Sequence, residues 1–242
     1  MNWKTENQNM LDIEAKKVKL DELYEEIYHC KICHEDKFRV KRALIESALK
    51  SKIFLIGEAL AGKTQRKSGI PYTYEDKRLS KTGDRLDKFL NLFNYTINSS
   101  GTSRYQYVYS SDIVQCLPAE DGNFELDKNW KPKAQVKKNC VDFVIREIKI
   151  IEPKLILLAG KVSRDTFYNN FRIDDASYER KSTKHIDKII ISVEIPQMKL
   201  DNLNLYVLPI IHPSPRTASL FNKKQYDMLK YSVIDRIVKI LN

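Results

Sequence analysis

The sequence predicts an α/β protein with three layers, α/β/α, around a central, mostly parallel sheet of four to five strands. Short apolar runs that suit buried strands alternate with amphipathic helical segments, and three of these runs end in loops of small or polar residues. The 242 residues are 42% hydrophobic, enough for one core, and no Gly/Ser-rich or Pro-rich linker divides them. We therefore expect one domain over residues 1–242.

The first half of the chain predicts two helices and two strands. Asn9–Tyr28 is rich in Leu, Glu and Lys, with apolar residues at helical spacing, which predicts an amphipathic helix. The apolar runs Lys52–Gly57 and Tyr107–Cys116 predict buried strands, and Gly83–Phe93 between them predicts a helix. Gly57–Gly62 is a small-residue loop, so a ligand can approach its backbone closely.

The second half continues the alternation after a polar loop at Ala119–Trp130. The predicted elements are a helix at Pro132–Ile151, a strand at Lys154–Gly160, a helix at Lys161–Asn169, a strand at Leu205–Ile211 and a closing helix at Asn222–Leu241. Phe171–Asn204 is a charged excursion in which we predict a hairpin strand at Lys188–Ile195.

The composition favours a polyanionic partner. Lys and Arg number 42 against 32 Asp and Glu, a net charge of +10 that fits nucleic acid, although many basic proteins bind none. The N-terminal residues carry no apolar signal-peptide core, and no apolar run approaches the roughly 18 residues of a membrane span. We expect a cytoplasmic protein with no membrane partner.

Four cysteines carry a second signal. Cys30 and Cys33 form a C-x2-C pair, and Cys116 and Cys140 follow after 82 and 23 intervening residues. In a reducing cytoplasm such cysteines are metal or cluster ligands more often than disulfides. The spacing leaves open a zinc site with four thiolates, an iron–sulfur cluster and four unconnected buried thiols.

Several motifs occur in a characteristic order. They are Gly57-Glu58-Ala59, Gly69-Ile-Pro71-Tyr72, the Ser80–Leu90 helix, Tyr109–Pro118, the Cys140–Gly160 helix and strand, and His212-Pro-Ser-Pro215. Together they resemble the uracil-DNA glycosylase superfamily, in particular its iron–sulfur branch, often called family four. The resemblance implies a DNA glycosylase that binds the phosphate backbone, flips one base and hydrolyses its N-glycosidic bond without a lyase step, and we expect a monomer. It also implies a [4Fe–4S] cluster on Cys30, Cys33, Cys116 and Cys140.

The resemblance assigns a role to each candidate site residue. His212 would donate a hydrogen bond to O2 of the departing base, and Glu58 would orient water or stabilise the sugar cation. The alternative for each residue is that it only organises its loop. Tyr72 would stack on the flipped base, beside the Gly57 and Ala59 backbone, unless it is a core residue. Three residues would contact DNA: Lys63, Ser214 and Arg216. Arg216 could also fill the gap left by the flipped base.

Two departures from the family pattern stand out. The Glu-Asp pair expected shortly after the first motif is replaced by Thr64, Gln65 and Arg66, so the water-activating acid is not identified by resemblance. Asp112 stands where the family has an asparagine that reads the base. An Asn amide can donate to uracil O4, whereas a carboxylate only accepts, so Asp112 favours a pyrimidine with a 4-amino group.

The sequence therefore predicts a glycosylase for a C5-modified cytosine, such as the hydroxymethylated or glucosylated bases of some phages, with a role in phage defence. Uracil repair is the main alternative, because Asp112 can also hold a proton or rotate away. A second alternative is a cluster-bearing nucleic-acid-binding protein without catalysis. The residue inserted between Leu60 and Arg66, together with the Phe171–Asn204 excursion, would give room for a larger C5 group.

Overall fold

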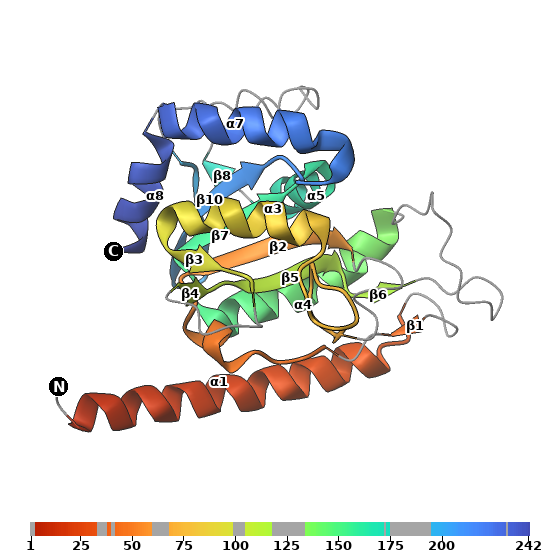
Figure 1. Ribbon diagram of the computed structural model, residues 1–242. Helices are drawn as coiled ribbons and strands as arrows, with labels where there is room; N and C mark the ends of the chain where they lie inside the picture. Colours follow the sequence, from red (N-terminus) through yellow and green to blue (C-terminus); the bar gives the residue numbers. More distant parts are fainter. Residues whose placement is uncertain are drawn as a thin grey trace.

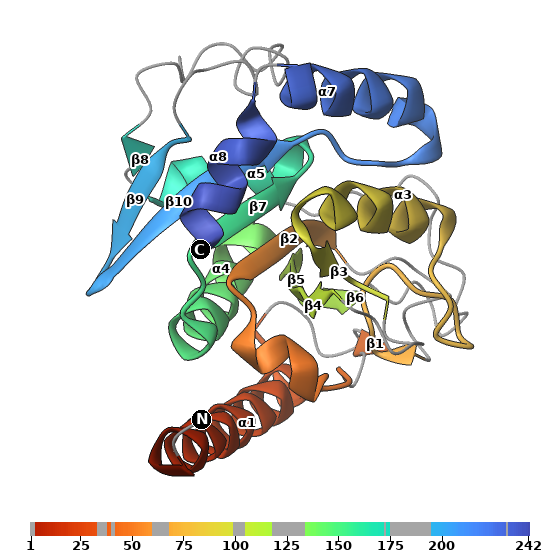
Figure 2. The ribbon, with the colours of Figure 1, turned by 60° about the vertical axis from the view of Figure 1, so that its left-hand side comes forward.

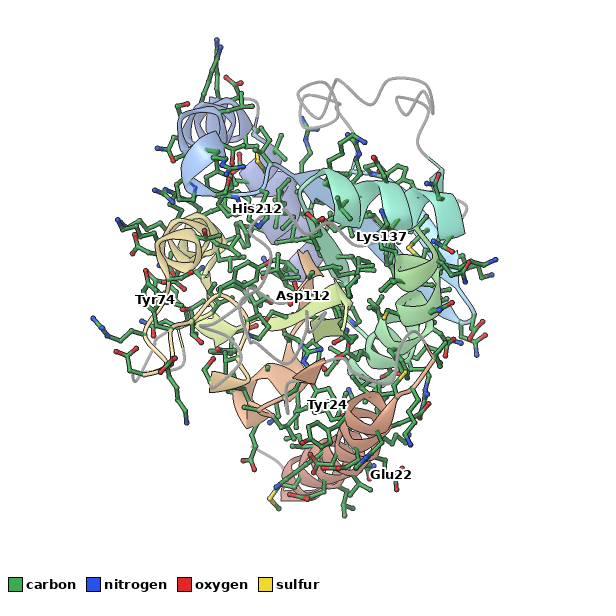
Figure 3. The ribbon with its side chains drawn as sticks, turned by 90° about the vertical axis from the view of Figure 1, so that its right-hand side faces the viewer. Glu22, Tyr24, Tyr74, Asp112, Lys137 and His212 are labelled. Carbon is green, nitrogen blue, oxygen red and sulfur yellow. The ribbon has the colours of Figure 1, made fainter. Side chains whose placement is uncertain are left out.

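A central sheet lies between two layers of helices in the computed structural model (Figure 1). The structure describes residues 3–32, 38–39, 42–59, 68–98, 105–117, 134–171, 173–174, 195–230 and 232–242. One face of the sheet packs against α1, α4 and α5, and the other against α3, α7 and α8, with a separate apolar core on each side. Figure 3 shows α3 and α7 on one side of the sheet and α4 and α5 on the other. The predicted three-layer fold is confirmed.

Six strands form the sheet, in the order β5-β2-β7-β10-β9-β8. Their bounds are Ile53–Ala59 (β2), Tyr109–Val114 (β5), Leu155–Ala159 (β7), Ile173–Asp174 (β8), Gln197–Leu200 (β9) and Leu203–Ile210 (β10). The first four in spatial order run parallel, while β9 and β8 add an antiparallel edge. Figure 2 shows the long β9–β10 hairpin at that edge. β7 is buried along its whole length, as expected of a parallel strand covered on both faces.

The helices fall close to their predicted positions. Their bounds are Trp3–His29 (α1), Lys81–Leu90 (α3), Ala134–Ile151 (α4), Lys161–Asn170 (α5), Ala218–Lys230 (α7) and Val233–Leu241 (α8), with short 3-10 turns at Glu46–Lys50 (η1), Asn91–Phe93 (η2) and Pro215–Thr217 (η3). α1 packs on α4, where Arg146 and Glu26 form a two-pronged ion pair with N–O distances of 2.6 and 2.7 Å. Ser80 caps the N-terminus of α3, where its hydroxyl accepts from the Gly83 N–H at 3.1 Å.

The predicted strand Tyr107–Cys116 is wrong as a single element, because its two ends leave the central sheet. Gln106–Tyr107 (β4) pairs with Tyr95–Thr96 (β3), and the Val108 N–H continues this contact by donating to the Thr96 carbonyl at 2.8 Å. Cys116–Leu117 (β6) pairs with Phe38–Arg39 (β1) in an antiparallel ladder. Only the middle, β5, belongs to the six-stranded sheet.

The single closing helix predicted at Asn222–Leu241 is also wrong, because the chain turns between α7 and α8. Ser232 has a φ of 56°, in the left-handed region that no α-helix continues through. The predicted loop Ala119–Trp130 and the hairpin strand at Lys188–Ile195, apart from Ile195, lie outside the described residues. The last strand begins at Leu203, two residues earlier than predicted. None of the described helices is long and apolar enough to cross a membrane.

Candidate active site

Four parallel strands end at one edge of the sheet and bring the predicted site residues there. Gly57 on β2 pairs with Asp112 on β5, while Ile210 at the end of β10 pairs with Ala159 at the end of β7. His212 therefore lies at the same edge as Asp112, separated by three strand spacings of about 4.8 Å each. Figure 3 labels both residues. This carboxyl-terminal edge is where open α/β sheets bind their ligands.

The Asp112 carboxyl group is buried against Gly57. A Cβ built on Gly57 would overlap Oδ1 of Asp112, so only glycine leaves space for the carboxyl at this position. Asp112 is 3% exposed, and its Oδ2 has no hydrogen-bond partner among the described residues. Burial raises its pKa from 3.8 to about 7, while Arg42 lowers it and Glu147 and Glu58 raise it further. Near neutral pH the group divides between its neutral and charged forms.

Tyr72 approaches the same point from the turn before α3. Its hydroxyl lies 2.8 Å from the place that a Cβ on Gly57 would occupy, and it too is buried without a hydrogen-bond partner among the described residues. Tyr72 has a φ of 65°, and its carbonyl accepts from the Ser80 N–H at 2.8 Å. Gly83 packs so closely on this carbonyl that a Cβ there would overlap it. The structure thus holds the Tyr72 backbone firmly, and the residue is 6% exposed.

Glu58 and Ala59 complete the end of β2. Both are half-buried, in line with their place at the edge of the sheet. The Glu58 carboxylate is close enough to Asp112 for its charge to raise the pKa of that neighbour. Two acidic side chains therefore share this edge, and repulsion between them favours keeping a proton on the more buried one, Asp112.

His212 occupies the opposite end of the row of strands and rests on Gly160. Gly160 has a φ of 95°, and a Cβ built on it would stand 3.0 Å from the His212 Cβ. Burial lowers the pKa of His212 below its usual 6.5, which keeps the imidazole neutral at physiological pH. A neutral imidazole still donates one N–H. The residue is therefore suited to hydrogen-bond an anion without carrying a charge of its own.

The loop after His212 is braced by hydrogen bonds. The Thr217 hydroxyl donates to the His212 carbonyl, and the Ser214 and Thr217 hydroxyl oxygens lie 2.9 Å apart. Arg85 on α3 donates to the Pro213 carbonyl at 3.3 Å. These contacts fix the loop relative to α3. Arg216, the middle residue of η3, is exposed to solvent.

A buried polar network lies under β5, on the face away from Asp112. The Arg42 guanidinium donates to Glu147 on α4 at 2.7 Å and to the Ser111 hydroxyl at 2.9 Å. Gln115 donates to the Asp112 carbonyl at 2.6 Å and to the Ser111 hydroxyl at 2.8 Å. Glu147 is completely buried, so these donors replace its lost hydration. The network fixes the strand that carries Asp112.

This network was not predicted from the sequence, although the position of one of its members, Glu147, indicates a buried charge. Glu147 lies on the apolar face of α4, four residues after Phe143 and four before Ile151, where a charge needs a buried partner. Arg42 left no comparable signal, because it is separated from Glu147 by 105 residues of sequence. Tyr109 also donates to Glu147, at 3.0 Å.

The four cysteines are described to different degrees. Cys30 follows the end of α1 and packs against the core that contains Cys140, a residue of α4 that is 5% exposed. Cys116 pairs with Arg39 at the β1–β6 ladder, with nothing described of its side chain, and Cys33 lies outside the described residues. Within the described part, no three potential ligands gather at one point. Figure 1 shows β1 and β6 near the C-terminal end of α1.

Lys63, and the segment Thr64–Arg66 that replaces the family's acidic pair, lie outside the described residues. The described site thus consists of Gly57, Glu58, Ala59, Tyr72 and Asp112 at one end of the row of strands, with His212 and its loop at the other.

Asp112→Asn should make stability less dependent on pH. The folded-state pKa of Asp112 lies near 7 against the ordinary 3.8, so its contribution to stability is complete below about pH 4 and is lost as the pH rises through about 7. Asn stays neutral throughout. Relative to wild type, the variant's free energy of unfolding should therefore rise by about 2–4 kcal/mol between pH 4 and pH 8, as measured by urea unfolding. If the free energies of unfolding of wild type and Asp112→Asn changed with pH in parallel, the raised pKa of Asp112 would be contradicted.

Comparison with known proteins gives one family and several relatives. The model of the Uracil DNA glycosylase superfamily matches residues 45–232. Type-4 uracil-DNA glycosylases of Archaeoglobus fulgidus and Sulfurisphaera tokodaii are 22% and 25% identical over 165 and 203 residues, or 68% and 84% of this chain and 71% and 76% of theirs. The Type-4 uracil-DNA glycosylase of Pyrobaculum aerophilum is 24% identical over 144 residues, 60% of this chain and 62% of that protein.

The family match spans the strand ends that carry Gly57, Asp112 and His212. All three relatives are of type 4, which confirms the resemblance that the motifs indicated. The match also confirms the predicted enzyme class, a DNA glycosylase that hydrolyses an N-glycosyl bond. On the order and placement of its motifs and on this match, the chain belongs to the Uracil DNA glycosylase superfamily.

Proposed function

We propose that this protein releases a C5-modified cytosine from DNA. The observation that carries the proposal is the buried Asp112 carboxyl, held against Gly57 at the carboxyl edge of the sheet. In its ionised form this group accepts hydrogen bonds and donates none, so it matches the 4-amino group of cytosine and opposes the O4 of uracil. A buried acceptor facing another acceptor is strongly unfavourable, which makes the discrimination large.

The same carboxyl also explains the main alternative substrate. In its neutral form Asp112 carries an O–H that can donate to uracil O4. With a pKa near 7 both forms are present at physiological pH. Uracil-DNA glycosylase activity, which the names of the relatives carry, is therefore the alternative function, and it is favoured at acidic pH. A binding protein without catalysis is the second alternative.

The reaction is a hydrolysis that needs stabilisation at two places. The bond between C1′ of the sugar and N1 of the base breaks, its electron pair leaves with the base, and a water oxygen bonds to C1′ while its proton is released. His212 donates its N–H to the developing charge on O2 of the base. Glu58 orients the water or stabilises the positive sugar, and Tyr72 stacks on the extruded base beside the Gly57 and Ala59 backbone.

DNA is held by its phosphates around the flipped nucleotide. Ser214 lies in the braced loop after His212, and exposed Arg216 follows it. These residues and Lys63 contact phosphates, and Arg216 can also enter the gap that the base leaves. The net charge of +10 supports such binding and predicts that it weakens with salt. We propose that the protein acts as a monomer.

Defence against phage is the setting that fits this substrate. Excision of plain cytosine would destroy the host's own DNA, whereas a C5-hydroxymethylated or glucosylated cytosine marks DNA as foreign. The segment between Leu60 and Arg66 and the excursion between Phe171 and Asn204 would admit the larger C5 group. Such a role places the protein in the cytoplasm, where phage DNA is replicated.

We also propose a [4Fe–4S] cluster on Cys30, Cys33, Cys116 and Cys140. Two observations support it: α1 and α4, which pack together, bring Cys30 and Cys140 to one core, and Cys116 belongs to the β1–β6 ladder. Thiolates are the ligands such clusters take. The cluster would hold the end of α1 and β6 to the sheet, and so it would stabilise the fold without taking part in the hydrolysis.

The first test is base release from matched duplexes that carry uracil, cytosine, 5-hydroxymethylcytosine or its glucoside. Wild type should release the modified cytosines, with a rate that rises as the pH passes about 7 and Asp112 ionises. Asp112→Asn should shift the preference toward uracil by roughly 10²-fold, because an amide can donate to O4. Efficient uracil release by wild type at every pH, with no modified cytosine released, would overturn the proposed substrate.

His212→Ala should lower single-turnover release by roughly 10²–10³, because it deletes the donor to O2. DNA affinity should stay within about twofold of wild type, since affinity comes mainly from phosphate contacts. Arg216→Gln is the matched control and should show the reverse pattern, with weaker DNA binding. The slope of log affinity against log salt concentration should fall by about the contribution of one charge. An unchanged release rate in His212→Ala would exclude the oxyanion role.

Protein purified without oxygen should be brown and should contain about four iron and four acid-labile sulfide atoms per chain. Cys116→Ser should reduce the yield of folded protein more than it reduces the release rate of the folded fraction, because the cluster is structural. Iron analysis and visible absorbance measure the first point, and thermal unfolding the second. One equivalent of zinc with no iron would replace the cluster by a closed zinc site.

A further inference from the structure

Two buried polar atoms meet at Gly57 without hydrogen-bond partners among the described residues. They are the Tyr72 hydroxyl and Oδ2 of Asp112. Because the Tyr72 hydroxyl lies 2.8 Å from the point where a Gly57 Cβ would stand, and Asp112 Oδ1 overlaps that point, the two side chains border one small space. A buried hydroxyl without a partner is costly, and native proteins rarely keep one without a reason.

The Tyr72 hydroxyl cannot leave this place easily. The Ser80 N–H and the close packing of Gly83 hold the Tyr72 backbone in its left-handed conformation. Since an aromatic ring has two side-chain torsions, a fixed backbone leaves the hydroxyl few other positions. Burial and the nearby Asp112 charge raise the pKa of Tyr72 well above its usual 10, so the hydroxyl keeps its proton and acts as a donor.

We propose that Tyr72 is a positioning residue for Asp112. Once a base is bound, the Tyr72 hydroxyl donates to Oδ1 of the Asp112 carboxylate, which leaves Oδ2 free to accept from the base. This assignment rests on the proposed function and deepens it. A ring stacked on the base extends its hydroxyl beyond the edge of the base, where Asp112 lies. The bond would select the rotamer of Asp112 in which Oδ2 faces the 4-amino group.

The donated hydrogen bond would also favour the ionised form of Asp112. Three charged groups already act on it: Glu58 on β2 and Glu147 on α4 favour the neutral form, whereas Arg42 favours the charged form. Because Arg42 and Glu147 are paired at 2.7 Å, their effects largely oppose each other. An O–H donated to Oδ1 would thus help to make Asp112 an acceptor at physiological pH.

Tyr72→Phe tests this directly, because it removes the hydroxyl and keeps the ring. Release of 5-hydroxymethylcytosine, measured under single-turnover conditions from about pH 5.5 to pH 9, should fall roughly 5-fold near pH 7 and approach roughly 10-fold at lower pH, and the midpoint of its rise should move up by about one pH unit. The rate should approach wild type at high pH. The melting temperature of the free protein should be unchanged or higher, since a hydroxyl without a partner is removed.

Tyr74→Phe, two residues later in the same turn, is the matched control and should leave the profile unchanged. A Tyr72→Phe profile that superposes on wild type, or a melting temperature that drops as it would for a lost hydrogen bond, overturns the role of Tyr72. If wild type releases uracil alone at every pH, the proposed substrate fails instead. The two failures are therefore distinguished by the wild-type substrate range and by the variant's pH profile.

Discussion

The buried ion pair between Arg42 and Glu147 is the interaction on which the site depends. It joins the segment before η1 to α4 through β5, with the Ser111 and Gln115 side chains inside the same network. Removing one partner of such a pair leaves an uncompensated buried charge, which typically costs about 3–5 kcal/mol. The face of β5 turned toward α4 is therefore fixed by polar bonds. Because Asp112 lies on the other face of the same strand, its position is fixed as well. Its main-chain carbonyl accepts directly from Gln115.

Burial and nearby charges then decide what Asp112 can do. Burial disfavours ionisation of the group, Glu58 adds to this effect, and the two charges of the network act on it in opposite directions. A carboxyl in such surroundings titrates near neutrality, unlike an exposed aspartate, so one side chain can present either a donor or an acceptor to a base. An asparagine at this position would present both groups at every pH. The change from amide to carboxyl thus makes base recognition depend on a proton.

The sequence predicted the three-layer fold well and the long-range contacts within it poorly. The apolar runs that form β2, β5, β7 and β10 are local signals, and the structure brings Gly57, Asp112 and His212, at or just beyond their ends, to one edge. The Arg42–Glu147 pair spans 105 residues, and no local pattern connects its two members. The turn at Ser232 that divides α7 from α8 was missed because the apolar periodicity continues across it. The strand predicted at Tyr107–Cys116 was too long because pairing with β3 and β1, rather than β-propensity, decided where its ends went.

Gly57 shows that a glycine can be required for a different physical reason than its sequence context indicates. Its small size predicted the close approach of a ligand to the backbone, yet in the described structure the space beside it is taken by side chains of the same chain, Asp112 and Tyr72. Both keep polar atoms without partners there, at a cost that the free protein bears. Interactions that are completed only when a substrate arrives favour the bound state over the free one, and catalysis needs the same bias toward the transition state. The two polar groups without partners beside Gly57 are therefore better explained by recognition than by stability.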